Sequence, residues 1–168
     1  MLEDIRVLVR GGGDLASGVV YRLFRSGMQV MVLELAQPTV IRRAVAFGAA
    51  MFEGLVEIEG IVGRRVDALE EAEDSLAKDE VPVMADPEGK AISEWSPEVL
   101  VDAILAKRNL GTKITDAPIV IGLGPGFAAG VDVHAVVETE RGHNLGRVIL
   151  EGTAAPDTGI PGAVMGYT

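Results

Sequence analysis

The sequence predicts an α/β fold: a mostly parallel β-sheet with helices on both faces and a C-terminal β-hairpin. Three observations support this class. Several short runs of apolar, β-branched residues end in glycine or in an acid, which is typical of buried parallel strands. An amphipathic segment separates the first two of these runs, as a crossover helix does. Toward the C-terminus, two strand-like segments instead flank a turn near Gly142, and this arrangement favours a hairpin.

The N-terminal segment has the pattern of a β-α-β unit. Residues 5–9 form a short apolar run that predicts a buried strand, and residues 29–35 predict a second one. Between them, residues 15–26 repeat apolar side chains at helical spacing, with Asp14 as the predicted N-cap and Gly27 as the residue that ends the helix. A crossover of this kind is right-handed and joins parallel strands.

The rest of the chain continues this alternation less clearly. We expect helices at residues 38–51 and 64–79, and strands at residues 55–61, 81–87, 117–126 and within the hairpin of residues 131–152. Residues 96–109 fit either a helix that starts at Ser96 and Pro97 or a buried strand, and the alternation of strands and helices favours the strand. No internal repeat or linker is evident, so residues 1–168 are predicted to form a single domain.

The composition excludes several classes of function. The 168 residues carry a net charge of −10, which repels nucleic acid and anionic lipid. Cysteine is absent and only two histidines are present, so no disulfide, thiolate nucleophile or metal-ligating set is predicted. No apolar run is long enough to span a membrane and the N-terminus does not resemble a signal peptide, so we expect a cytoplasmic protein.

A glycine-rich turn joins the first predicted strand to the first predicted helix. The six residues from Gly11 to Ala16 match the pattern G-x-G-x-x-A. In this pattern the first glycine allows the tight turn, the second lets the backbone approach a pyrophosphate, and the helix N-terminus supplies free N–H groups. Because the pattern lies within a β-α-β unit, it favours a Rossmann-like nucleotide-binding domain in which Gly11, Gly13, Asp14 and Leu15 contact the ligand. The alternative is a tight turn without a ligand.

An acid and two arginines follow at positions where further ligand contacts are expected. Glu34 ends the second predicted strand, where an acid that binds ribose hydroxyls belongs, and it favours NAD over a 2′-phosphorylated cofactor. Arg42 and Arg43 fall in the first turn of the next predicted helix, where cations oppose the helix dipole and therefore require a partner. That partner is either an acid of the protein, such as Glu34, or a second anionic group of the ligand.

A second glycine-rich segment, IVIGLGPGFAAG at residues 119–130, runs from a predicted strand into a turn. In an open α/β sheet the carboxyl ends of the strands line the ligand crevice, so this turn is placed to face the same ligand as the first one. Gly124, Gly126 and Phe127 are therefore secondary candidates for ligand binding. The alternative is that these glycines satisfy only the geometry of a tight loop.

No catalytic residue is predicted. The sequence lacks a Tyr-x-x-x-Lys pair, the G-x-S-x-G nucleophile turn and the G-x-x-x-x-G-K-[ST] phosphate loop. His134, with Asp132 and Glu138 on the same side of a predicted strand, is the remaining candidate base, although a solvated strand face is the favoured explanation. The chain is thus predicted to hold a nucleotide rather than to transform a substrate. The alternatives are a small NAD-dependent oxidoreductase and a regulatory or scaffold domain with a vestigial nucleotide site.

Four long segments carry a family resemblance: GGGDLASGVVYRLFRSG, ELAQPTVIRRAVAF, VLVDAILAKRN and LGPGFAAGVDVHAVVETERGHNLGRVI, the last followed by TGIPG. Together they resemble the YqeB-type maturation proteins of selenium-dependent molybdenum hydroxylases, which are related to the accessory proteins of xanthine dehydrogenase. The resemblance covers nearly the whole chain. Members of the family continue past GIPG into a further small domain, so the resemblance implies either a short member or a chain that lacks this C-terminal domain.

The resemblance implies an accessory protein that binds a molybdenum cofactor and passes it to the hydroxylase apoenzyme. The cofactor would be molybdopterin dinucleotide, with an NAD-like dinucleotide as the other candidate. A molybdopterin dinucleotide has a ribose for Glu34 and additional anionic groups for Arg42 or Arg43. The expected partners are this dinucleotide and the apoenzyme, with no nucleic acid or membrane, and a homo-oligomer stays open. Since the chain has no cysteine, a partner would supply any activated sulfur or selenium.

Overall fold

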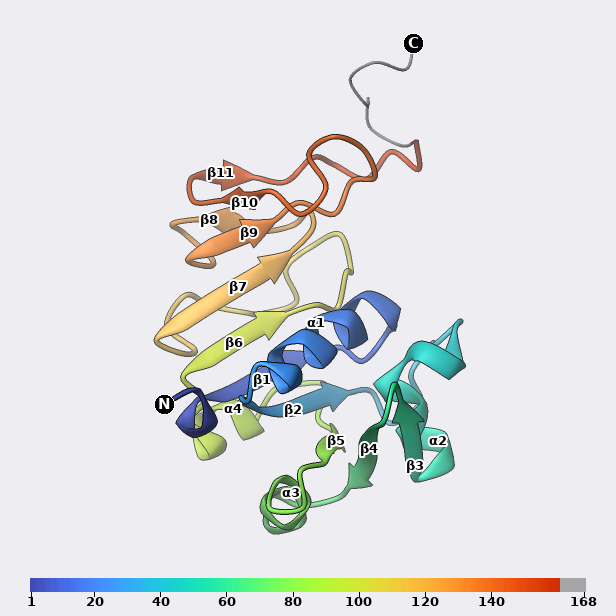
Figure 1. Ribbon diagram of the computed structural model, residues 1–168. Coiled ribbons are helices and arrows are strands. Elements are labelled where there is room, and N and C mark those ends of the chain that lie inside the picture. Colours follow the sequence, from blue (N-terminus) through green and yellow to red (C-terminus); the bar gives the residue numbers. More distant parts are fainter. Residues whose placement is uncertain (161–168) are drawn as a thin grey trace.

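The computed structural model of the chain describes residues 1–160, and Figure 1 shows the arrangement of its helices and strands. The strands are β1 (Arg6–Arg10), β2 (Gln29–Glu34), β3 (Leu55–Ile58), β4 (Ile61–Val66), β5 (Val81–Ala85), β6 (Val99–Asp102), β7 (Ile119–Leu123), β8 (Ala128–Ala129), β9 (Ala135–Val137), β10 (Val148–Ile149) and β11 (Gly152–Thr153). The α-helices are α1 (Asp14–Arg25), α2 (Ala50–Glu53), α3 (Leu69–Leu76) and α4 (Ala91–Trp95). Short 3₁₀ turns occupy Leu2–Asp4, Arg43–Val45 and Phe47–Ala49.

A single large sheet organises the described residues. Its strand order is β10-β9-β7-β6-β1-β2-β5-β4-β3, and β8 pairs with β11 in a separate small ladder. Neighbouring strands from β4 across to β9 are parallel, whereas the two outermost pairs, β3–β4 and β9–β10, are antiparallel. The predicted parallel sheet and C-terminal hairpin are therefore confirmed. The series β5-β2-β1-β6-β7-β9 corresponds to the 3-2-1-4-5-6 order of a doubly wound, Rossmann-like sheet.

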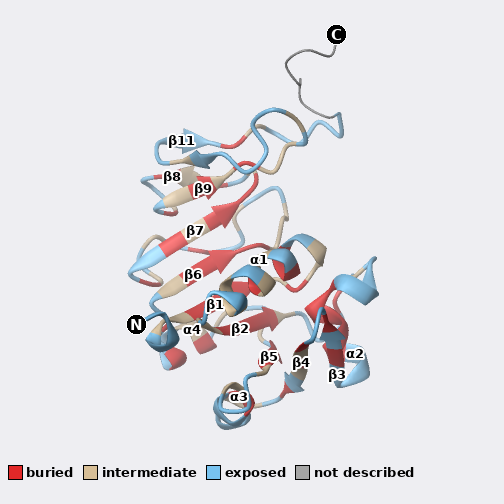
Figure 2. Cartoon of the chain, viewed as in Figure 1, coloured by how far each residue is buried: buried red, intermediate tan, exposed pale blue. Residues whose placement is uncertain are grey.

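The sheet has a hydrophobic core on each face. Val7 and Val9 of β1 belong to the same buried cluster as Val20 of α1, whereas Leu8 between them belongs to the opposite cluster with Trp95 of α4. Since successive side chains of a strand point to opposite faces, a continuous apolar run is fully buried only when both faces are covered. Figure 2 shows the central strands buried between these two layers.

The predicted β-α-β unit is present, and β1 and β2 are parallel. The N-cap of α1 is Gly13, however, and not Asp14, which is the first residue of the helix. Gly27 follows the helix with a φ of 90°, the left-handed conformation that glycine adopts most easily after a helix end. The glycine turn thus lies between the end of β1 and the first turn of α1, as the sequence predicts.

The helix predicted at residues 38–51 is wrong. This segment contains only the 3₁₀ turns at Arg43–Val45 and Phe47–Ala49 and then α2. Besides the short-range bonds of these turns, its backbone is bonded to the glycine turn and α1: the N–H of Phe47 donates to Ser17 Oγ, and the N–H of Gly48 donates to the carbonyl of Gly12, both at 2.8 Å. Tertiary hydrogen bonds have therefore replaced the i→i−4 bonds of a helix.

The boundaries of the other helices and strands differ less from those predicted from the sequence. The helix predicted at residues 64–79 begins only at Leu69, because residues 61–66 form β4 and complete the sheet between β3 and β5. The strand favoured within residues 96–109 is confirmed as β6, and those expected at 81–87 and 117–126 are confirmed as β5 and β7. The short helix α4 and the small strands β8 and β11 were not predicted.

Within residues 1–160, no helix has the length and apolar character needed to cross a membrane. In the same part of the chain, no group of three or more His, Cys, Asp or Glu side chains is arranged to hold a metal ion. Residues 161–168, which include Pro161 and Gly162 of the GIPG segment, lie outside the described residues.

Candidate functional site

The order of the strands creates a crevice beside β1. From β1 the chain builds one side of the sheet with β2 and β5, and it later returns to the opposite side of β1 with β6 and β7. The loops that follow β1 and β6 therefore lead away in opposite directions above the carboxyl ends of two adjacent strands. In open α/β sheets, ligands bind at such a switch point.

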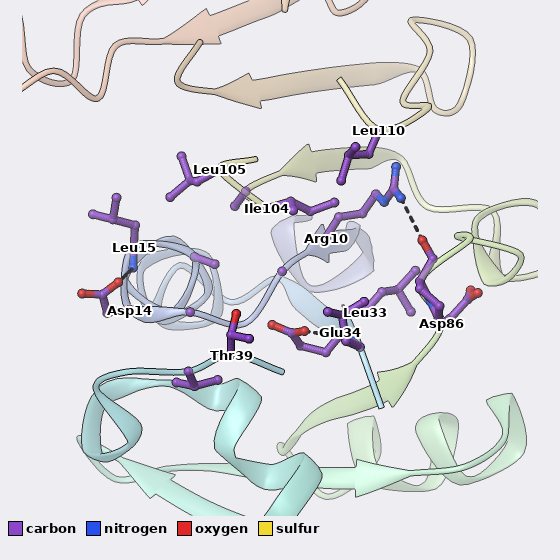
Figure 3. A pocket seen from close by; sticks show the side chains of 17 residues that line it. Arg10, Asp14, Leu15, Leu33, Glu34, Thr39, Asp86, Ile104, Leu105 and Leu110 are labelled. Atoms are coloured by element: carbon purple, nitrogen blue, oxygen red, sulfur yellow. Dashed lines mark hydrogen bonds between the residues drawn. The ribbon is translucent and has the colours of Figure 1, made fainter. Parts of the chain in front are cut away.

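A cavity of about 310 Å³ lies at this point, and we call it the switch-point cavity (Figure 3). The loop after β1, the first turn of α1, the ends of β2 and β5 and the loop after β6 all contribute to its walls. Five of the predicted ligand-binding residues line it, namely Gly11, Gly13, Asp14, Leu15 and Glu34. The remaining walls are largely apolar and include Leu33, Ile104 and Leu105. The volume lies at the lower end of the range found for small-molecule sites.

The first two glycines of the turn are required by close packing. Gly11 has a φ of 97°, and a Cβ at this position would lie 2.8 Å from the carbonyl oxygen of Ala103. A Cβ on Gly12 would lie 2.8 Å from the backbone nitrogen of Gly48. These two glycines thus allow the loops that border the cavity to touch one another.

Gly13 differs from its two neighbours. Its φ is −69°, and a Cβ built on it would have no other atom within 4 Å. The fold therefore does not require glycine here, whereas a ligand that approaches the backbone closely would. As a glycine N-cap, Gly13 supplies no side-chain hydrogen bond to the first helical turn, where the N–H of Leu15 donates to Oδ1 of Asp14.

Glu34 is bonded to the glycine turn from the end of β2. Its Oε1 accepts a hydrogen bond from the N–H of Gly12 at 2.8 Å, and its Oε2 accepts one from the N–H of Leu35 at 2.6 Å. A carboxylate has about four acceptor positions, so two backbone bonds leave capacity for hydroxyl groups of a ligand. Glu34 lines the switch-point cavity in this geometry, and its contact with a ribose stays a prediction.

Arg42 pairs with an acid of the protein, which is one of the two alternatives drawn from the sequence. Its Nη1 donates to Oδ2 of Asp14, and this pair bridges the segment after β2 to the start of α1. Arg42 also lines a second cavity of about 430 Å³, which shares Gly13, Asp14 and Leu15 with the first. The two cavities therefore adjoin at the N-terminus of α1, and Arg141 borders the second one.

The remaining predicted site residues do not line the switch-point cavity. Arg43 stacks on Phe52, with its guanidinium carbon 4.6 Å from the ring centre. Gly126 packs against the backbone of Arg108, and Gly124 packs against Thr139. Phe127 is buried in the core, where its ring lies over Gly122. The second glycine-rich segment thus satisfies loop and core packing in this structure.

Several polar residues at the site were not predicted from the sequence, among them Thr39 and Asp86 on the cavity wall and a buried network around Arg10. Arg10 ends β1 and lines the switch-point cavity, and Asp102 ends β6 directly beside it in the sheet register. The hydroxyl of Thr112 lies between them and contacts both side chains. The sequence feature that could have indicated Arg10 and Asp102 is a charged residue at the end of an apolar run, as in RVLVR and VLVD, next to a glycine turn or loop.

The cluster of Asp132, His134 and Glu138 serves the local backbone. Nδ1 of His134 accepts a hydrogen bond from the N–H of Val120 at 2.9 Å, and Oδ2 of Asp132 accepts one from the N–H of Ala128 at 2.9 Å. Glu138 is buried, and burial raises the pKa of its carboxyl, but bonds from the backbone N–H groups of residues 155, 140 and 139 outweigh that effect and lower the pKa below 4.5. His134 does not line the switch-point cavity.

The fold and the cavity define a Rossmann-like α/β domain with a ligand-sized cavity at its switch point. In sequence, the chain is similar to the uncharacterized protein YqeB of Escherichia coli (strain K12), with 50% identity over 162 residues. The match covers 96% of this chain and 30% of YqeB, so the chain spans less than a third of that relative's length. The similarity supports the likeness to YqeB noted above, and the relative's name gives no function. No family model and no solved structure matches the chain.

Proposed function

We propose that this domain binds a dinucleotide-type cofactor in the switch-point cavity and acts as an accessory factor for a molybdenum hydroxylase. The observation that carries the binding proposal is the open position at Gly13, a glycine that the fold itself does not need, at the start of α1 and on the wall of the cavity. The accessory role rests on the resemblance to YqeB-type maturation proteins, of which the similarity to YqeB supports only the likeness to YqeB itself.

The geometry of the two adjoining cavities suits an elongated ligand. A pyrophosphate over the start of α1 would face the first turn of the helix and the positive end of the helix dipole. A ribose on one side would reach Glu34, and the other half of the ligand would extend toward Arg42 in the second cavity. The Asp14–Arg42 pair balances the negative charge of Asp14 beside the place proposed for the pyrophosphate.

The side chains around the switch-point cavity favour holding a ligand over transforming it. The carboxylates of Glu34 and Asp86 both accept hydrogen bonds from backbone N–H groups, those of Asp86 coming from Gly89 and Ala91. Such groups are held in position by the backbone, as the few polar groups that orient a ligand in a binding site are. We therefore propose that the domain protects the cofactor and transfers it to the hydroxylase apoenzyme in the cytoplasm.

A thermal-shift panel tests the binding proposal. NAD, NADP, CDP, CTP and molybdopterin dinucleotide are each added to the wild type, to Gly13→Val and to Gly18→Val. A nucleotide at 100 times its dissociation constant stabilises a protein by about 2.7 kcal/mol, which raises Tm by several degrees. Gly13→Val adds a side chain to a residue that lines the cavity, whereas Gly18 lies in an equally open position on α1 and does not line it, which makes Gly18→Val the matched control.

We expect the cytidine or pterin ligands to raise Tm of the wild type and of Gly18→Val but not of Gly13→Val. A shift with NAD alone would instead favour the oxidoreductase alternative. The absence of any shift with all five ligands would contradict the proposal and leave the scaffold alternative.

A further inference from the structure

Arg10 is a buried cation on the wall of the switch-point cavity. It is the last residue of β1, and only 4% of its surface is exposed. Figure 3 shows its side chain along the cavity, between Leu110 and Asp86. Arg10 also borders a polar groove of about 890 Å³, near α4, so two openings lead toward the same guanidinium group.

The hydrogen bonds of Arg10 within the described residues go to neutral oxygens. Nη1 donates to the hydroxyl of Thr112 at 2.8 Å, and Nη2 donates to the carbonyl of Pro87 at 3.2 Å. The nearest carboxylate oxygen, Oδ2 of Asp102, lies 3.9 Å from Nη1, beyond hydrogen-bond distance. A guanidinium group has five N–H donors, so these two bonds leave part of its planar fork for another acceptor.

Asp102 does not fill that place, because its own oxygens have other partners. Oδ2 accepts the hydroxyl proton of Thr112 at 2.6 Å, and Oδ1 accepts a bond from the N–H of Ile104 at 3.2 Å. Thr112 is fixed in turn by two hydrogen bonds with the side chain of Asn109. Thr112 therefore bridges the buried Arg10–Asp102 ion pair and orients the guanidinium, which makes no direct hydrogen bond to Asp102.

Asp102 balances the buried charge of Arg10 across 3.9 Å, but the guanidinium has no anion at hydrogen-bond distance, and a charge-assisted hydrogen bond would stabilise it further. Arginine is also the residue whose planar fork best matches the two oxygens of a carboxylate or phosphate. We propose that Arg10 is an oxyanion-binding residue of the switch-point cavity. It would take a phosphate or carboxylate group of the ligand, separate from the pyrophosphate at the glycine turn. In assigning this group to the same ligand, the inference rests on the proposed function.

Small anions test this site without the complete cofactor. Tm is measured with inorganic phosphate and with acetate at constant ionic strength, against chloride as the reference salt. The proteins are the wild type, the double variant Arg10→Gln/Asp102→Asn and the control Arg6→Gln. The double variant removes both buried charges together and so avoids an uncompensated Asp102, whereas Arg6 lies at the opposite end of β1 and pairs with Glu73.

We expect phosphate or acetate, at ten times its dissociation constant, to raise Tm of the wild type and of Arg6→Gln by about 3 °C and to leave the double variant unchanged. A larger response to phosphate would indicate that Arg10 binds a phosphoryl group of the ligand. A larger response to acetate would indicate that it binds a carboxylate. A further variant, Arg10→Lys, keeps the charge but lacks the fork, and it should bind the same anion at least several-fold more weakly. The comparison of Arg10→Lys with the wild type tests the site even if the double variant fails to fold.

Two results would overturn the inference: no response of the wild type to either anion, or an equal response in the wild type and both Arg10 variants. Repeating the titration on Gly13→Val separates this failure from failure of the proposed function. A phosphate response that survives in Gly13→Val, in a protein that binds none of the nucleotides, would retain the Arg10 site and reject the dinucleotide. The opposite result would be nucleotide binding that is unchanged in Arg10→Lys, together with no response of the wild type to phosphate or acetate. That result would retain the dinucleotide site and reject the Arg10 site.

Discussion

Two adjacent glycines of the turn have different physical reasons to be glycine. At Gly12 the constraint is internal, because the backbone of Gly48 lies where a Cβ would be. At Gly13 the fold leaves open space, and we propose that the preference for glycine there comes from a ligand that approaches the turn. The pattern G-x-G-x-x-A alone does not distinguish these cases, since it says nothing of what surrounds each position.

This difference predicts unequal effects of alanine on stability. Gly12→Ala should lower the free energy of unfolding by more than about 2 kcal/mol, because backbone atoms must move to admit the methyl group. Gly13→Ala should change it by less than about 1 kcal/mol, since Gly13 has an ordinary φ and open space. Urea denaturation of both variants measures these values. Equal losses at the two positions would contradict the assignment of Gly13 to the ligand.

Glu138 predicts a specific pH dependence. Its folded pKa lies below the ordinary value of 4.5, so its carboxylate stabilises the protein above that pH, and this contribution is lost as the pH falls through the folded pKa. Glu138→Gln should therefore be less stable than the wild type at pH 7, by about 2 kcal/mol, and the difference should shrink below pH 4.5.

Thermal denaturation from pH 7 to pH 3 checks this expectation. The exposed Glu151, from the same C-terminal region, provides a matched control, and Glu151→Gln should follow the wild-type profile. If the difference in Tm between Glu138→Gln and the wild type were the same at every pH, the three backbone hydrogen bonds would not depend on the charge of the carboxylate.

At the scale of the residue, the sequence predicts the groups that belong to a local pattern. Gly11, Gly13 and Glu34 were found because their spacing is set within one β-α-β unit, and all three line the cavity. The pairing of Arg10 with Asp102 could not be found in this way. It depends on the register between β1 and β6, two strands that lie far apart in the sequence.

At the scale of the element, the clearest failure was the helix expected at residues 38–51. Its apolar spacing was adequate, but the segment lies against the glycine turn, where hydrogen bonds to Gly12 and Ser17 are available. Intrinsic propensity is a weak influence, and tertiary partners override it in a segment that packs closely on a loop. The first helix, α1, was predicted well because its pattern and its partner strands all lie within about 30 residues.

α1 provides a test of helical propensity in this molecule. Gly18 lies within α1 and is exposed, and a Cβ there would meet no other atom within 4 Å. Gly18→Ala should therefore stabilise the protein by about 0.5–1 kcal/mol, because alanine loses less backbone entropy in a helix. Ala44→Gly makes the reverse change, but residue 44 lies in a 3₁₀ turn, so the loss there should be smaller. Denaturant midpoints of the two variants compare these effects, and a larger effect at residue 44 would contradict the boundaries described here.

At the scale of the whole molecule, the strand order determines where a ligand site can form. The parallel sheet places the glycine turn after β1 opposite the loop after β6, and the cavity between them exists only because the chain crosses from one side of β1 to the other. The sequence predicted this class of sheet from alternation alone. It did not predict that the second glycine-rich segment would pack away from the cavity, because that outcome depends on the contact of Phe127 with Gly122 in the folded core.

The central claim is that a nucleotide binds at the glycine turn, and NMR titration of ¹⁵N-labelled protein with CDP and with NAD tests it most directly. We predict that one of these nucleotides shifts the amide signals of Gly13, Asp14 and Leu15 first, followed by those near Glu34 and Ile104, because these residues share one cavity. Saturating amounts of both nucleotides without any shift would contradict the claim. Shifts confined to residues outside the two adjoining cavities would contradict it as well.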